Sequence, residues 1–158
     1  MKEKILILKS EILKDQERLD NLFKKFEKAY DGFSGTGDYS KLVESAFYVN
    51  QIYSGCERIF KNIAKSFENN IEQDLWHKSL LDRMALDIKG IRPNVVSEKT
   101  LEYLDELRAF RHFFRHAYDT DIDKEKFRII AHKTNLLRSS LKKDLKKFLG
   151  FLDKLIKA

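Results

Sequence analysis

The sequence predicts an all-α protein: an up-and-down antiparallel helical bundle with four long helices and one short helix. Apolar residues recur at steps of three, four and seven along most of the chain, which is the period of one helix face. One proline and six glycines leave these patterns largely uninterrupted. No segment has the alternation of apolar and polar residues that indicates a strand.

Composition and length favour one globular domain over residues 1–158. The chain is 42% hydrophobic and 35% charged, a balance that excludes a disordered protein. Cys56 is the single cysteine, so no internal disulfide can form, in agreement with a cytoplasmic location. No stretch approaches the roughly 20 apolar residues of a membrane span, so we expect no membrane partner.

Five helices are expected, with short connections between them. They cover residues 3–30, 38–68, 73–89, about 97 to 118, and 124–157. The glycine-rich segment 32–37 is interpreted as the first connector, since it lacks the preceding strand and following lysine of a phosphate-binding loop. Asp38 or Ser40, Ser97 and Asp123 are the expected N-caps.

The segment LRAFRHFFRHAY, residues 107–118, has the strongest functional pattern. It holds three arginines and two of the four histidines, and no acidic residue, in a chain of net charge +6. Within it, Arg111, His116 and Tyr118 place a permanent cation, a group that titrates near neutral pH and a phenol within eight residues.

Helix geometry limits how these three residues can meet. Arg111 and Tyr118 are seven apart and fall within about 20° of each other on a continuous helix. His116 lies about 140° from Arg111. His116 can therefore join Arg111 only if the helix ends near it, or if a second subunit completes the site.

This combination suits RNA cleavage without a metal ion or cofactor. Histidine can take a proton from the 2′-hydroxyl or give one to the leaving oxygen, and arginine can bind the phosphate with two donors. A purely structural interpretation is also open. In it the arginines pair with Glu44, Glu57 or Glu102, His116 caps a helix and Tyr118 packs.

Residues 104–118, LDELRAFRHFFRHAY, resemble the signature region of the HEPN superfamily, and most closely HepT-like toxins with their Arg-x4-His-x-Tyr motif. Residues 44–68 are similar to the family's second helix, with Glu57 and Lys61 as polar marks. The resemblance implies that Arg111 stabilises the scissile phosphate and that His116 acts in acid–base catalysis. Tyr118 would belong to the site and also accept AMP from an antitoxin.

The resemblance also implies a type II or type VII toxin–antitoxin pair, in which a homodimer that cleaves RNA is neutralised by a minimal nucleotidyltransferase. Arg108, His112 and Arg115 would add contacts to RNA phosphates. His112 departs from the family, where the residue after the arginine is often Asn or Asp, and this leaves substrate preference open.

Other functions fit the sequence less well. His112 and His116 have a zinc-like spacing but lack the glutamate that would follow the first histidine, so no metal site is expected. The main alternative to the nuclease is a non-catalytic helical module that uses the same basic helix to bind a nucleotide, RNA or protein. A scaffold without a nucleic-acid role is the third possibility.

Overall fold

The computed structural model describes residues 1–68 and 76–158 of the chain, which form five helices and no strand. The helices are α1 (Lys2–Thr36), α2 (Tyr39–Phe67), α3 (Trp76–Met84), α4 (Glu98–His116) and α5 (Lys124–Lys157). The predicted all-α class, with four longer helices and one short helix, is therefore confirmed. No helix in the described part of the chain is long and apolar enough to cross a membrane.

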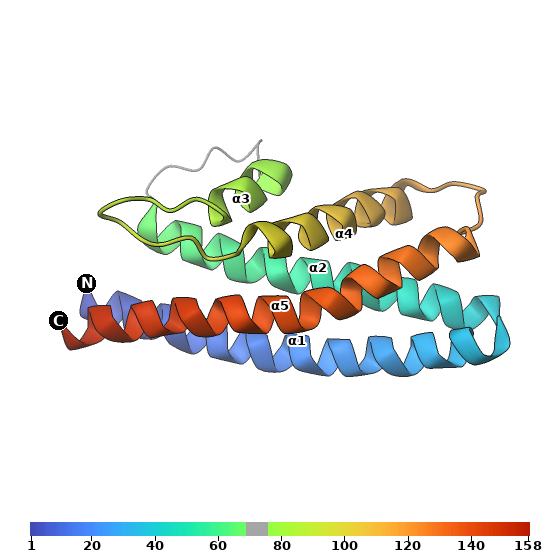
Figure 1. The fold of residues 1–158 in the computed structure, drawn as a ribbon, viewed down its shortest axis with the longest axis horizontal. Helices are drawn as coiled ribbons and strands as arrows, with labels where there is room; N and C mark the ends of the chain where they lie inside the picture. The colour runs from blue at the N-terminus through green and yellow to red at the C-terminus, as the bar shows by residue number, and fades with distance from the viewer. Residues whose placement is uncertain (69–75) are drawn as a thin grey trace.

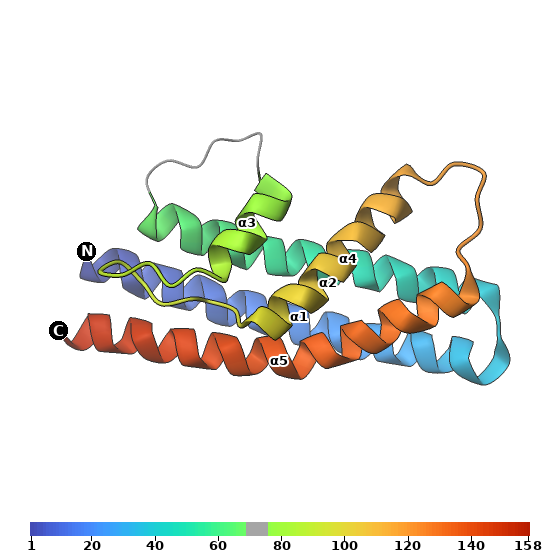
Figure 2. The same ribbon diagram turned by 45° about the horizontal axis from the view of Figure 1, so that its top comes forward.

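Three long helices form the body of the bundle, and α4 lies across it. α1, α2 and α5 run lengthwise beside one another, while α4 packs on α2 and α5, and α3 lies beside α2 and α4 (Figure 1). Turned by 45°, the molecule shows the C-terminal half of α4 rising away from α5 (Figure 2). The basic segment of α4 is consequently carried to the surface of the bundle.

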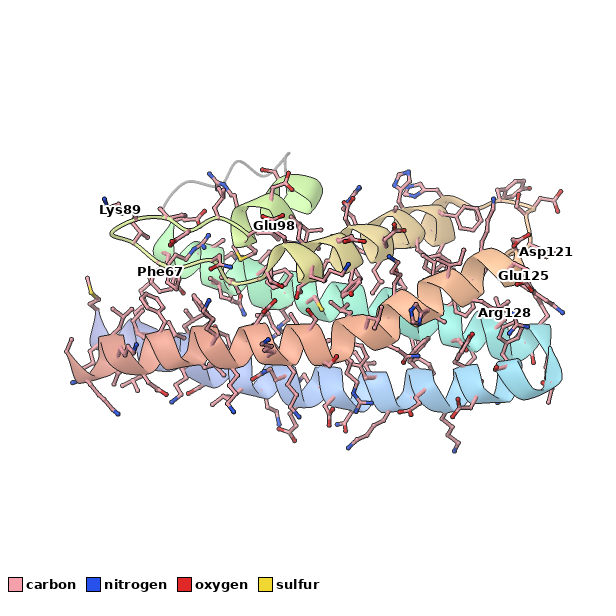
Figure 3. The ribbon with its side chains drawn as sticks, in the orientation of Figure 1. Phe67, Lys89, Glu98, Asp121, Glu125 and Arg128 are labelled. Carbon is pink, nitrogen blue, oxygen red and sulfur yellow. The ribbon has the colours of Figure 1, made fainter. Side chains whose placement is uncertain are left out.

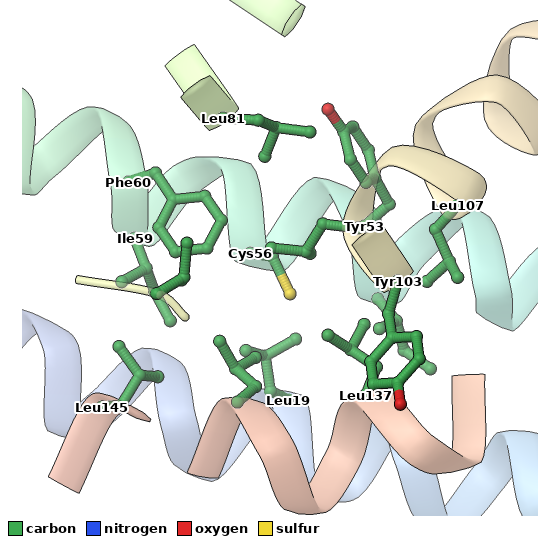
Figure 4. Packing of buried hydrophobic residues seen from close by; sticks show 14 of the residues in the cluster. Leu19, Tyr53, Cys56, Ile59, Phe60, Leu81, Tyr103, Leu107, Leu137 and Leu145 are labelled. Atoms are coloured by element: carbon green, nitrogen blue, oxygen red, sulfur yellow. The ribbon is translucent and has the colours of Figure 1, made fainter. Parts of the chain in front are cut away.

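The core is built on a close contact between α1 and α2. A Cβ atom at Gly55 would lie 2.7 Å from Leu19 Cδ2, so a larger residue would require the Leu19 side chain to move. Cys56 is fully buried next to Gly55, with its sulfur among core side chains that include Leu19 (Figure 4). Its burial makes Cys56 a small apolar residue of the core.

Polar contacts fix the start of α4. Ser97 is its N-cap and accepts a hydrogen bond from the Thr100 amide, as predicted. The Ser97 amide donates to Asp144 of α5 at 2.9 Å. Before it, the fully buried guanidinium of Arg92 pairs with Glu68 at the end of α2. The segment before α4, expected to be only an extended connector, is thus anchored at both ends.

The predicted ends of α1 and α3 were wrong. α1 does not end at residue 30 but continues through most of the glycine-rich segment to Thr36, where Gly37 ends it with φ 72°. The buried Phe33 holds this last turn on the core and offsets the cost of the helical glycines. α3 ends at Met84, because the chain turns there into a bridge between Ile88 and Arg92. Its expected start, residues 73–75, lies outside the described residues.

The remaining N-cap predictions concern the starts of α2 and α5. Asp38 rather than Ser40 caps α2, and its carboxylate accepts from the Ser40 amide. Asp123 caps α5 by accepting from the Lys126 amide. Asp121, Glu125 and Arg128 mark the end of the molecule where α5 begins, the same end to which the C-terminus of α4 points (Figure 3).

Candidate active site at the end of α4

The last three turns of α4 border a shallow surface hollow of about 100 Å³. It is lined by Arg108, Arg111, His112, Arg115 and His116. Five of the six residues named as candidates from the sequence thus share one surface. Arg111 and His116 both border the hollow although they lie about 140° apart around the helix, because the hollow follows the broad arc between them.

Arg111 is held in place from α2. Its Nη1 lies 3.5 Å from Glu57 Oε2, and its guanidinium carbon lies 5.4 Å from the centre of the Tyr53 ring. The Arg111 side chain is 15% exposed and that of Glu57 is 7% exposed. Glu57 also pairs with Lys61 at 2.9 Å. Since α2 supplies both the carboxylate and the aromatic ring, Arg111 has a defined orientation before any ligand binds.

The other two arginines differ in their partners. Arg108 Nε donates to Asp105 on the same helix at 2.8 Å. Arg115 is exposed and has no ion-pair partner among residues 1–68 and 76–158. It lies in the last turn of α4, where the helix dipole favours a positive charge. Arg115 is therefore the arginine most free to bind an anion from solution.

The two histidines stack on the outer side of the hollow. Their ring centres are 4.4 Å apart. His116 Nδ1 lies 2.9 Å from the backbone oxygen of His112. A carbonyl oxygen can only accept, so Nδ1 carries the proton and Nε2 of the neutral ring has the free lone pair. His116 thus presents a proton acceptor at the exposed end of α4.

Tyr118 lies outside the hollow. α4 ends at His116, and Ala117 already has an extended backbone with ψ 124°. The expectation that Tyr118 lies beside Arg111 on one helix face was therefore wrong, because it required the helix to continue through residue 118. The Tyr118 side chain is 92% exposed and is not among the residues that line the hollow.

The structural interpretation fits part of this geometry. Arg111 does pair with Glu57, and His116 does contact a carbonyl of the last helical turn. Tyr118 is exposed rather than packed, and Arg115 has no acidic partner in the described regions. Tyr53 was expected only as a core residue, but its spacing of four from Glu57 places both on one face of α2.

Larger cavities lie elsewhere but contain no histidine. One of about 530 Å³ lies between α1 and α5, where Arg138 is already paired with Asp20 at 3.0 Å. Another of about 510 Å³ has a mainly apolar lining that includes Phe110 and Phe113 on the opposite side of α4. Neither offers an imidazole beside a guanidinium, so the candidate site is identified by its chemistry rather than by its size.

The class defined by this fold and this motif is a HEPN-type helical bundle. A profile for the family described as HepT-like protein matches residues 45–152, which is about two thirds of the chain. The match includes most of α2, the basic hollow and most of α5. The chain belongs to the HepT-like family of the HEPN superfamily, as its resemblance predicted. Comparisons with curated proteins and with solved structures gave no match.

Proposed function

We propose that this protein is a metal-independent endoribonuclease of the HEPN type, and the toxin of a toxin–antitoxin pair in the cytoplasm. One observation carries the proposal. A HepT-like chain gathers its motif arginine and histidine around one hollow on the exposed end of α4, with further cations beside them. Family membership is generally associated with HEPN nucleases, and the hollow supplies the side chains that such chemistry needs.

The proposed reaction uses His116 and Arg111 on one RNA phosphate. His116 Nε2 accepts the proton of a 2′-hydroxyl, whose oxygen then attacks the adjacent phosphorus. The bond from phosphorus to the 5′-oxygen breaks, and that oxygen takes a proton from a second imidazole. Arg111 neutralises the negative charge that builds up on the phosphorane, while Arg115, Arg108 and His112 bind neighbouring phosphates. The products are a 2′,3′-cyclic phosphate and a free 5′-hydroxyl.

A second imidazole is supplied most simply by a second copy of the chain. We propose a homodimer in which two α4 ends face each other across a cleft, so that each bound phosphate meets two motifs. The exposure of the α4 end and its position at one end of the molecule support this arrangement.

Tyr118 fits a separate role as a modification site. Its phenol is 92% exposed and follows the histidine of the motif by two residues. In the proposed reaction a nucleotidyltransferase antitoxin lets the phenol oxygen attack the α-phosphorus of ATP, and pyrophosphate leaves. The added AMP would carry negative charge to the edge of the basic hollow and so repel RNA.

The decisive test compares two histidine variants in RNA cleavage. His116→Ala should lower the rate by about 100-fold or more, since general acid–base catalysis contributes that much. His132→Ala is the matched control, because His132 is an exposed histidine on α5 away from the hollow. Cleavage should persist in EDTA and should require the 2′-hydroxyl at the cut.

Two outcomes would contradict the proposal. If His116→Ala cuts RNA as fast as the wild type, His116 has no catalytic role. If the wild type binds RNA in a salt-dependent way but never cuts it, the protein is the non-catalytic binding module instead.

A further inference from the structure

The side chain of Arg111 is held more firmly by its neighbours than the side chain of an ordinary surface arginine. Its guanidinium lies between the Glu57 carboxylate and the Tyr53 ring, and its Nε atom is buried without a hydrogen-bond partner among the described residues. Because Nε is shielded, the donors that can reach a phosphate in the hollow are the two terminal nitrogens. A long side chain that is fixed in this way loses less entropy when it binds a phosphate.

The acid that confines Arg111 comes from another helix. Residues 107–116 of α4 contain three arginines and two histidines without one acidic residue. Glu57 of α2 supplies a carboxylate that is only 7% exposed, and a carboxylate so deeply buried is stable only when it is paired. Its described contacts include two cations, Lys61 and Arg111, so one negative charge holds Arg111 without cancelling the positive charge of the hollow.

Tyr53 completes the support from beneath. Its side chain is buried, and its ring extends from α2 toward α4 (Figure 4), where the guanidinium carbon of Arg111 lies 5.4 Å from the ring centre. Burial, with a further contribution from the charge of Glu57, raises the pKa of the Tyr53 phenol above its ordinary value. The ring therefore stays neutral over the whole working range of pH and keeps its attraction for the guanidinium.

We propose that Glu57 is a positioning residue for the RNA-cleaving site, and that it acts by fixing the guanidinium of Arg111 toward the scissile phosphate. This inference depends on the proposed nuclease function. Glu57 itself does not touch RNA, because Arg111 lies between it and the hollow. The charge of Glu57 should therefore affect the rate of the chemical step more than the affinity for RNA.

The test measures kcat and KM for RNA cleavage by Glu57→Gln, a change that keeps the size of the side chain and removes its charge. We expect kcat to fall by roughly tenfold to hundredfold, with KM changed by less than about twofold. Lys61→Gln is the matched control, because it removes a different ion pair of the same carboxylate and leaves the contact between Glu57 and Arg111 in place. In an Arg111→Lys background, Glu57→Gln should have no further effect on kcat.

A second measurement follows Arg111 without any RNA. The Nε–H signal of Arg111 in ¹⁵N NMR should be sharp and protected from exchange in the wild type, since Nε is buried. It should broaden and exchange rapidly in Glu57→Gln but not in Lys61→Gln. A protected signal in Glu57→Gln, or an unchanged kcat in that variant, would overturn the positioning role while leaving the nuclease intact.

A different result would overturn both proposals. If the wild type cuts no RNA and Arg111 is nevertheless released in Glu57→Gln, the nuclease proposal fails. The contact between Glu57 and Arg111 then serves stability alone, and the positioning role is rejected with it.

Discussion

Arg111 and His116 belong to one short motif, yet the structure places them in opposite environments. Arg111 is 15% exposed and is contacted by Glu57 and Tyr53 from α2. His116 is exposed in the last turn of α4, and its contacts are with His112 of the same turn. The bundle thus fixes the cation of the motif but leaves its imidazole at an unsupported helix end.

This difference shows which part of the candidate site one chain can form and which part needs a second chain. A fixed guanidinium needs no further partner to stabilise a phosphorane. An exposed imidazole lacks the water-excluding surroundings in which proton transfer is efficient. We therefore expect the histidine side of the site to be completed by a second copy of the chain.

The largest expected effect tests that completion by mixing the wild type with an inactive variant. Arg111→Ala and His116→Ala should each lose about 100-fold or more of the cleavage rate. Wild type and His116→Ala, unfolded together in equal amounts and refolded as a mixture, should show about one quarter of the activity of the same total amount of wild type. About half of the dimers would then be mixed and would lack the second imidazole that each phosphate needs, and about one quarter would be wild-type dimers.

Wild type refolded alone is the control and should recover its full activity. About half of the wild-type activity in the mixture would mean that each chain cleaves RNA without an imidazole from its partner. A protein that sediments as a monomer at every concentration would contradict the dimer altogether.

The second effect compares the held arginine with the unpaired one. Arg115→Ala should weaken binding of a 2′-O-methylated RNA and lower the slope of log affinity against log salt by about 0.7, the value for one lost phosphate contact on a single strand. Its free energy of unfolding should stay unchanged, because Arg115 is exposed and has no acidic partner in the described chain. Fluorescence anisotropy and urea unfolding measure the two quantities.

Arg111→Ala should behave differently in the same measurements. It removes one cation from a largely buried carboxylate, so we expect it to lower the free energy of unfolding by about 1–3 kcal/mol. Equal losses of stability in both variants would remove the distinction between a held and a free arginine.

The sequence predicted more of the fold than of the site. Periodicity and caps identified α2, α4 and α5, because Asp38, Ser97 and Asp123 hydrogen-bond within their own first helical turns. The local sequence pattern did not predict where α1 ends. The packing of Phe33 against distant parts of the chain outweighs the cost of two glycines in the last turns of the helix. Local rules cannot account for a boundary that is set by tertiary contacts.

The site shows the same limit. Spacing identified Arg111 and His116, and it named Glu57 as one of three possible acidic partners. It could not single out Glu57, because that choice depends on how α4 crosses α2. It also placed Tyr118 on the face of Arg111, since no pattern in residues 107–118 showed that the helix ends at His116.

The smallest expected effect concerns the core beneath Arg111. It tests whether α2 is rigid enough to hold Arg111 in one orientation. Burial raises the pKa of the Cys56 thiol to about 12, against an ordinary value of about 8.5. The folded state therefore binds this proton more tightly than the unfolded state. The stabilisation is complete below the unfolded pKa and is lost as pH rises toward the folded one.

Between pH 7.5 and 9.5 the wild type should lose about 1 kcal/mol more stability than Cys56→Ala, by this linkage. Urea unfolding at the two pH values measures the difference, and the range ends below pH 10 so that Tyr53 does not contribute. The native thiol should also resist a disulfide reagent that reacts at once after unfolding. Rapid labelling of the folded protein would show that α2 opens beside Tyr53 and Glu57, and a helix that opens there could not hold Arg111 in one orientation.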